Sequence, residues 1–126
     1  MATKVMIVDD DKDFLTEISE TLVLVGYEVS AVNDPTQVVE KALRENPNVM
    51  LLDLKMPKIN GFSLAAEMRH YPELANLPII AVTGYFKEDY LPLMNICGIH
   101  NYLKKPFNVL DAITQIEAAR KELKKR

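Results

Sequence analysis

The chain has 126 residues, a formal net charge of −3 and 48% hydrophobic residues. This length fits one domain of about 100–150 residues and excludes an enzyme built from separate cofactor and substrate domains. The acidic balance offers no basic field for nucleic acid, so we expect no direct nucleic-acid partner. No apolar run approaches the roughly 20 residues of a membrane helix, and the lone cysteine, Cys97, has no disulfide partner in the chain. We therefore predict a single cytoplasmic domain over residues 1–126, without membrane insertion and without an output domain.

Short apolar runs predict five buried strands. Near-continuous apolarity in such runs is typical of parallel strands that are covered on both faces. The fifth run is less clearly apolar than the others. In chain order, the predicted strands are Val5–Val8, Tyr27–Val32, Val49–Leu52, Pro78–Val82 and Asn101–Leu103.

Two segments with helical periodicity separate the first three strands. The first segment ends before Gly26, a residue suited to a helix C-terminal cap. The second follows Asp34, whose carboxylate can cap a helix, with Pro35 at the first helical position, and it stops near Pro47. The apolar stripe predicted for the first helix consists of Phe14, Ile18, Leu22 and Val25.

Three further helices are predicted in the second half of the chain. One covers Gly61–His70, and a short one lies around Tyr90–Cys97, where Pro92 is tolerated only in the first turn. The last begins at Asn108 and ends in the cations Lys124-Lys125-Arg126, which suit the negative end of a helix dipole. The residues expected to face inward are Leu64, Ala65 and Met68 in the first of these helices, and Val109, Ile113, Ile116 and Leu123 in the last.

Strand–helix alternation repeated five times predicts an α/β fold, a doubly wound five-stranded parallel sheet with right-handed crossovers. Functional residues of such folds gather at the carboxyl ends of the strands. The predicted strands end in Asp9-Asp10, in Asp53, in Thr83 and in Lys105, so we expect these side chains to converge on one edge of the sheet.

The charge expected at this edge indicates a metal site. Asp9, Asp10 and Asp53 together carry −3, and Lys105 returns +1. Carboxylates that close repel one another, and Mg²⁺ prefers hard oxygen ligands of this kind. A carboxylate can attack phosphorus to form an aspartyl phosphate, and a metal, an ammonium group and a hydroxyl can stabilise the transferred group.

The motifs at these strand ends resemble the receiver domains of bacterial two-component response regulators, from Lys4 to about Leu123. This family has a (βα)5 flavodoxin-like fold. The stretches that carry the resemblance are Val5-Met6-Ile7-Val8-Asp9-Asp10, Leu51-Leu52-Asp53-Leu54-Lys55-Met56-Pro57 with Asn60-Gly61-Phe62, Ile79-Ile80-Ala81-Val82-Thr83-Gly84 and Tyr102-Leu103-Lys104-Lys105-Pro106-Phe107.

The resemblance implies a role for each residue. Asp53 would be the phosphorylation site and a Mg²⁺ ligand, and Asp10 and the carbonyl of Lys55 would be further ligands, with Asp9 acting by charge or through water. Thr83 and Lys105 would bind phosphoryl oxygens. Tyr102 would be the aromatic switch residue that turns inward when Thr83 moves, and Pro106 would follow a cis peptide bond.

The implied function is a signalling switch, not an enzyme in the usual sense. It would catalyse only its own phosphorylation and dephosphorylation. The donor would be a phosphohistidine on a sensor histidine kinase or a histidine phosphotransfer protein, and the downstream target is unknown. A receiver excised from a longer regulator or hybrid kinase is an alternative.

Three further sequence features bear on this interpretation. Lys55 and Tyr85 should lie at the rim of the phosphoryl pocket, as in a single-domain sporulation phosphorelay regulator, and predict a long-lived phosphoryl group. The acids after the first strand argue against a flavodoxin-like cofactor binder, whose loop there must accept phosphate. Lys55 replaces the second acid that a haloacid-dehalogenase-type phosphatase needs two residues after its nucleophile.

Overall fold

The computed structural model describes residues 2–124, and their side chains as far as residue 121. Its core is one five-stranded sheet in which every pairing is parallel and the order is β2-β1-β3-β4-β5. This order confirms the predicted doubly wound α/β fold. The strands are β1 (Lys4–Val8), β2 (Glu28–Val32), β3 (Val49–Asp53), β4 (Ile79–Thr83) and β5 (Asn101–Lys104).

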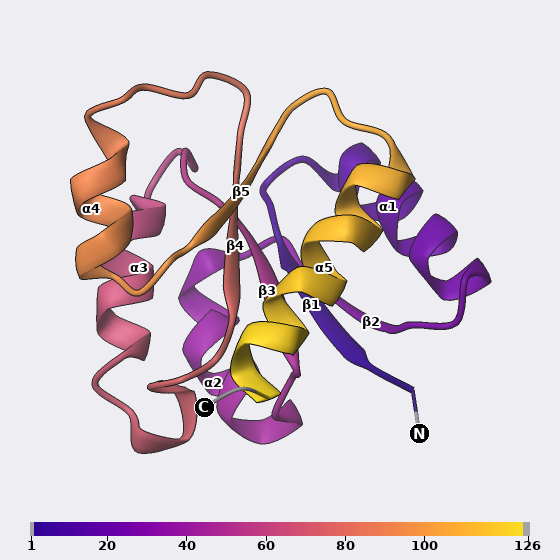
Figure 1. Ribbon diagram of the computed structural model, residues 1–126, viewed down its shortest axis with the longest axis horizontal. Helices are drawn as coiled ribbons and strands as arrows, with labels where there is room; N and C mark the ends of the chain where they lie inside the picture. Colours follow the sequence, from indigo (N-terminus) through magenta and orange to yellow (C-terminus); the bar gives the residue numbers. More distant parts are fainter. Residues whose placement is uncertain (1, 125–126) are drawn as a thin grey trace.

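Helices cover both faces of the sheet (Figure 1). The helices α1 (Lys12–Leu24) and α5 (Val109–Lys124) pack on one face. On the opposite face lie α2 (Val38–Glu45), α3 (Gly61–Met68) and α4 (Tyr90–Ile96).

The burial pattern explains the continuous apolar runs of the central strands. Every residue of β3 and β4 is buried, because helices cover both sides of these strands. The edge strands β2 and β5 are only partly buried. One hydrophobic core lies on each face of the sheet, with Met6, Met50 and Met68 in one and Ile7, Leu22 and Ile116 in the other.

The end of α1 differs from the prediction at Val25. The helix ends at Leu24, and the Val25 side chain is 51% exposed, so its place on the buried stripe was wrong. Gly26 has a φ of 104°, and the chain turns there toward β2. Leu15 instead joins Ile18 and Leu22 among the buried residues of this helix.

The second and third helices begin or end differently from the prediction. Asp34 does cap, accepting from the backbone N–H of Thr36 at 3.0 Å, but the capped element is a 3-10 turn, η1 (Pro35–Gln37), and α2 follows it. The helix α3 ends at Met68 rather than His70, before a second 3-10 turn, η2 (Pro72–Leu74).

The last two helices begin close to the predicted positions. Pro92 is the third residue of α4, in the first turn, where a helix needs no backbone N–H donor. Before α5, the Asn108 side chain accepts from the backbone N–H of Asp111 at 2.9 Å. Ile116 is fully buried as predicted, whereas the Leu123 side chain and the cationic end of the chain lie outside the described part.

Candidate functional site

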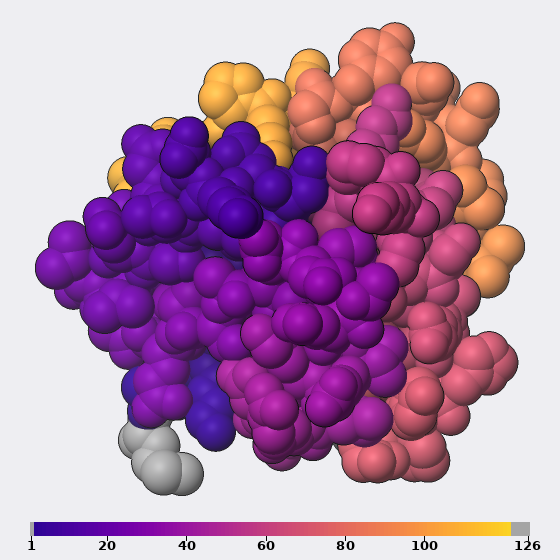
Figure 2. Space-filling view, turned by 180° about the vertical axis from the view of Figure 1, so that it is seen from behind, coloured from indigo at the N-terminus to yellow at the C-terminus, as the bar shows by residue number. Residues whose placement is uncertain are grey.

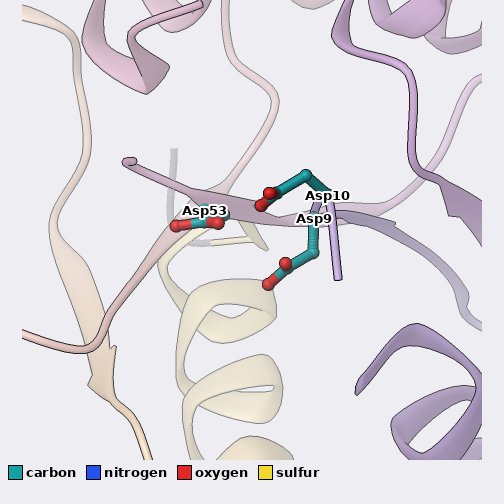
Figure 3. Close-up of side chains that lie close together, drawn as sticks. All are labelled: Asp9, Asp10 and Asp53. Atoms are coloured by element: carbon teal, nitrogen blue, oxygen red, sulfur yellow. The ribbon is translucent and has the colours of Figure 1, made fainter. Parts of the chain in front are cut away.

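Three carboxylates meet at the carboxyl edge of the sheet. Asp9 and Asp10 follow β1, Asp53 ends β3, and the two strands are neighbours that pair Val8 with Leu52. One oxygen from each of the three carboxylates lies within 4.8 Å of the others. Figure 3 shows the Asp10 carboxylate turned toward Asp53. In the space-filling view, segments from distant parts of the sequence, coloured indigo, magenta and orange, meet along this edge (Figure 2).

The carboxylates differ in exposure and in partners. Asp9 and Asp53 are only 1% and 7% exposed, whereas Asp10 faces solvent. Asp9 accepts from the backbone N–H of Asp11 at 2.9 Å, and Asp53 accepts from the backbone N–H of Lys55 at 3.0 Å. These bonds fix the orientation of both buried carboxylates.

Lys105 joins the cluster from the far edge of the sheet. Its Nζ donates to Asp9 Oδ2 at 2.6 Å, across 96 residues of sequence. Its backbone N–H donates to the carbonyl of Thr83 at 2.8 Å, which ties the end of β5 to the end of β4. The peptide bond between Lys105 and Pro106 is cis, as the resemblance implied.

The surroundings of Asp53 perturb its ionisation. Burial raises the pKa of Asp53 to about 6, and the charges of Asp9 and Asp10 add to the rise. The backbone N–H of Lys55 and the ammonium of Lys105 oppose it. Burial and the neighbouring acids therefore disfavour the ionised form of this carboxyl group.

The donor set fits a divalent cation. Carboxylate oxygens are hard ligands, and three converge here with a net excess of negative charge. Mg²⁺ characteristically takes one or two protein carboxylates and fills its remaining positions with water and phosphate oxygens. The residues that could hold such an ion are Asp9, Asp10 and Asp53, which the sequence analysis also selected.

Thr83 ends β4, and Tyr102 is the second residue of β5. Among the described residues, neither side chain forms a hydrogen bond with Asp9, Asp10 or Asp53. Thr83 is 1% exposed, and its hydroxyl donates to the carbonyl of Tyr85 at 2.9 Å. Tyr102 is 42% exposed, and its ring stacks on Phe86 with a centroid separation of 4.2 Å. Phe86 belongs to the loop before α4, and no pattern in the sequence indicated this contact.

Two more residues escaped the sequence analysis. Phe14 was assigned only to the apolar stripe of α1, but its ring centroid lies 4.2 Å from Lys105 Nζ. Gly61 was part of a quoted motif without a stated reason. A Cβ atom there would lie 2.6 Å from the carbonyl oxygen of Asp53, so only glycine fits beside this strand end.

The parallel sheet and the cluster of Asp9, Asp10, Asp53 and Lys105 at its carboxyl edge form the arrangement expected of a receiver domain. A model of the response regulator receiver domain matches residues 5–117, and the chain belongs to this family. It is a receiver domain of phosphorelay signalling and acts as a signalling switch. The family match decides against the flavodoxin-like cofactor binder and the phosphatase.

Relatives of known role are similar over most of this chain. The transcriptional regulatory protein CpxR homolog of Haemophilus influenzae is 32% identical over 116 residues, which cover 92% of this chain and 49% of that protein. The DNA-binding dual master transcriptional regulator RpaA of Synechocystis is 28% identical over 91% of this chain and 48% of its own length. The chain spans about half the length of the curated relatives it matches.

Solved structures agree with the fold in detail. The chemotaxis protein CheY4 of Vibrio cholerae matches with a TM-score of 0.90 and 26% identity, over 94% of this chain and 99% of that one. A CheY-like receiver domain of Methanospirillum hungatei matches with a TM-score of 0.90 and 27% identity, over 99% of this chain and 98% of that one. Among the described residues, no helix has the length and apolarity needed to cross a bilayer.

Proposed function

We propose that this receiver accepts a phosphoryl group on Asp53 in a Mg²⁺-dependent reaction. The observation that carries the proposal is the position of the Asp53 carboxylate: buried at the end of β3, with an oxygen within 4.8 Å of oxygens of Asp9 and Asp10. An Asp53 oxygen attacks phosphorus, the new O–P bond forms, and the P–N bond to the donor histidine breaks. The electron pair of that bond stays on the imidazole nitrogen.

Asp10, Asp53 and the carbonyl of Lys55 are the proposed ligands of the ion, and Asp9 assists by charge or through water. When bound, Mg²⁺ neutralises the negative charge that collects on the carboxylates and the transferred group. Asp9 meanwhile holds the Lys105 ammonium at 2.6 Å, so that a cation stands ready beside the reacting carboxylate.

The conformational switch follows from the partners that change. Thr83 can bind a phosphoryl oxygen only by giving up its bond to the Tyr85 carbonyl. We propose that this movement opens space into which Tyr102 turns, leaving its stack on Phe86. The switch therefore replaces the Thr83–Tyr85 hydrogen bond and the Tyr102–Phe86 stack by contacts of the active conformation. Phosphorylation supplies the free-energy difference that favours the active over the inactive conformation.

We also propose a long-lived phosphoryl group. Tyr85 is 62% exposed at the rim, and the ammonium groups of Lys55 and Lys87 lie 6.0 and 5.7 Å from its ring centroid. We propose that this ring, with the two cations near it, covers the phosphoryl group and restricts the approach of water in line with the phosphorus atom.

The donor is proposed to be a phosphohistidine on a sensor histidine kinase or a phosphotransfer protein in the cytoplasm. A mostly apolar groove between α1 and the loop before α5 adjoins Lys105 and is suited to a helix of such a donor. Phe14, Ile18, Pro106 and Phe107 line it. We propose that the whole chain acts as one receiver domain that catalyses only its own phosphorylation and dephosphorylation.

The experiment that tests this function is intact mass spectrometry after incubation with phosphoramidate and Mg²⁺. We expect the parent protein to gain one phosphoryl mass, Asp53→Asn to gain none, and excess chelator to abolish the gain. Equal phosphorylation of the parent and Asp53→Asn would disprove the assignment of the acceptor. Full phosphorylation in excess chelator would disprove the role of the metal.

A further inference from the structure

The Lys105 ammonium contacts one charged side chain and one aromatic side chain. One is the Asp9 carboxylate at 2.6 Å. The other is the face of the Phe14 ring, whose centroid lies 4.2 Å from Nζ. This distance is well inside the range of about 6 Å over which an aromatic face attracts a cation.

Contacts within the fold hold both the backbone and the ring of Phe14. Its backbone N–H donates to the side chain of Asp11 at 3.1 Å, as part of the N-terminal cap of α1. Its ring packs edge-on against Phe107, with a centroid separation of 5.8 Å and an interplanar angle of 80°. Phe107 lies two residues after Lys105, so the ring and the lysine are held by the same short loop.

A ring suits this position better than another charged group would. A second carboxylate would add negative charge to a site that already holds three, and would repel an incoming phosphoryl group. That carboxylate would also occupy an N–H donor of the Lys105 ammonium that could otherwise bind a phosphoryl oxygen. An aromatic face attracts the ammonium without adding net charge.

We propose that Phe14 is a positioning residue for phosphoryl transfer. Its ring holds the Lys105 ammonium beside Asp9, so that Nζ reaches a phosphoryl oxygen without first leaving solvent. Without the ring, the flexible four-carbon stem of the lysine can sample more rotamers, and the ammonium regains water. This inference rests on the proposed function, because it concerns the rate at which Asp53 is phosphorylated.

The test measures the rate constant of phosphorylation by phosphoramidate at saturating Mg²⁺, since a small donor needs no docking groove. Three variants are compared with the parent: Phe14→Leu, which keeps an apolar side chain but no ring, Phe14→Tyr, which keeps the ring, and 3,4,5-trifluorophenylalanine incorporated at position 14. Fluorination leaves the ring shape nearly unchanged but removes the negative potential of its face. A role in packing alone would not distinguish the fluorinated ring from the natural one.

We expect Phe14→Leu and the fluorinated protein to react about five-fold more slowly than the parent, within the range of about two- to thirty-fold that cation–π energies allow. Phe14→Tyr should retain the parent rate. Equal rates for the fluorinated and natural rings would overturn the inference while leaving the acceptor role of Asp53 intact. Failure of the parent itself to gain a phosphoryl group would instead overturn the proposed function, and this inference with it.

Discussion

Replacement of Asp53 by Asn should stabilise the metal-free protein. The Asp53 carboxylate is 7% exposed and shares its site with Asp9 and Asp10. Asn has nearly the same shape, and its side-chain oxygen can still accept from the backbone N–H of Lys55, as the carboxylate does at 3.0 Å. The substitution therefore removes the charge and keeps the packing.

The magnitude follows from the ionisation of Asp53. Burial, aided by the neighbouring acids, raises the pKa of this carboxyl from its ordinary 3.8 to about 6. Because the folded-state pKa lies above the unfolded one, folding favours the protonated form, and stability falls as the pH rises from about 4 to about 6. The full rise corresponds to about 3 kcal/mol of unfolding free energy, lost above about pH 6.

The assay is urea unfolding, followed by circular dichroism, in excess chelator across this pH range. We expect Asp53→Asn to exceed the parent by up to about 3 kcal/mol near pH 7.5 and to match it near pH 4. Added Mg²⁺ should stabilise the parent more than the variant, because an ion that binds only the folded state stabilises it by mass action.

The matched control is Asp89→Asn. Asp89 is exposed at the start of α4, and its side chain makes no cap hydrogen bond, so this substitution should change stability by much less than Asp53→Asn does. The reasoning is refuted if Asp53→Asn shows no gain near neutral pH. A gain of the same size at acid pH refutes it equally, since the proposed cause is ionisation.

Gly61→Ala should lower the free energy of unfolding by about 2–4 kcal/mol in thermal or urea unfolding, because the new Cβ would lie 2.6 Å from the backbone at the end of β3. The control Gly84→Ala, with no atom within 4 Å of its Cβ, should lower it by less than about 0.5 kcal/mol. Equal losses in the two variants would contradict this prediction. Arg69→Met should lower the free energy of unfolding by about 3 kcal/mol in the same assay. The guanidinium of Arg69 donates to four backbone carbonyls and so ties α3 to η2 and to the end of α4. An unchanged unfolding midpoint would contradict that role. The double variant Lys55→Asn, Tyr85→Ala should lose its phosphoryl group several-fold faster than the parent in a mass-spectrometric time course, and an unchanged lifetime would remove the proposed cover.

The sequence located much of the candidate site because one physical rule connects strand ends to function. Parallel strands bring their carboxyl ends to the same edge, so Asp9, Asp10, Asp53 and Lys105 could be placed together before any coordinates were known. Local signals worked equally well where the cause was local. The cap predicted at Asp34 uses a bond to the backbone N–H of Thr36, two residues away.

Errors arose where local patterns compete with tertiary packing. Val25 continues the apolar periodicity of α1, but the chain turns at Gly26 before the side chain can face the sheet. Asp34 and Pro35 form a good helix start, yet the first turn is 3-10 rather than α. In both cases the pattern correctly predicted a helix, but it misplaced the end of α1 and the start of α2.

The sequence alone determined the fold class, the family and the identities of the candidate site residues, because periodicity and strand-end motifs are written in neighbouring positions. Only the tertiary structure decided which contacts those residues make. Lys105 binds Asp9, Phe14 lies under Lys105, and Tyr102 stacks on Phe86. The first two contacts join residues about 90 positions apart in the sequence. These residues meet because the start of α1 and the end of β5 lie at the same edge of the sheet. All three depend on side-chain directions that no linear pattern encodes.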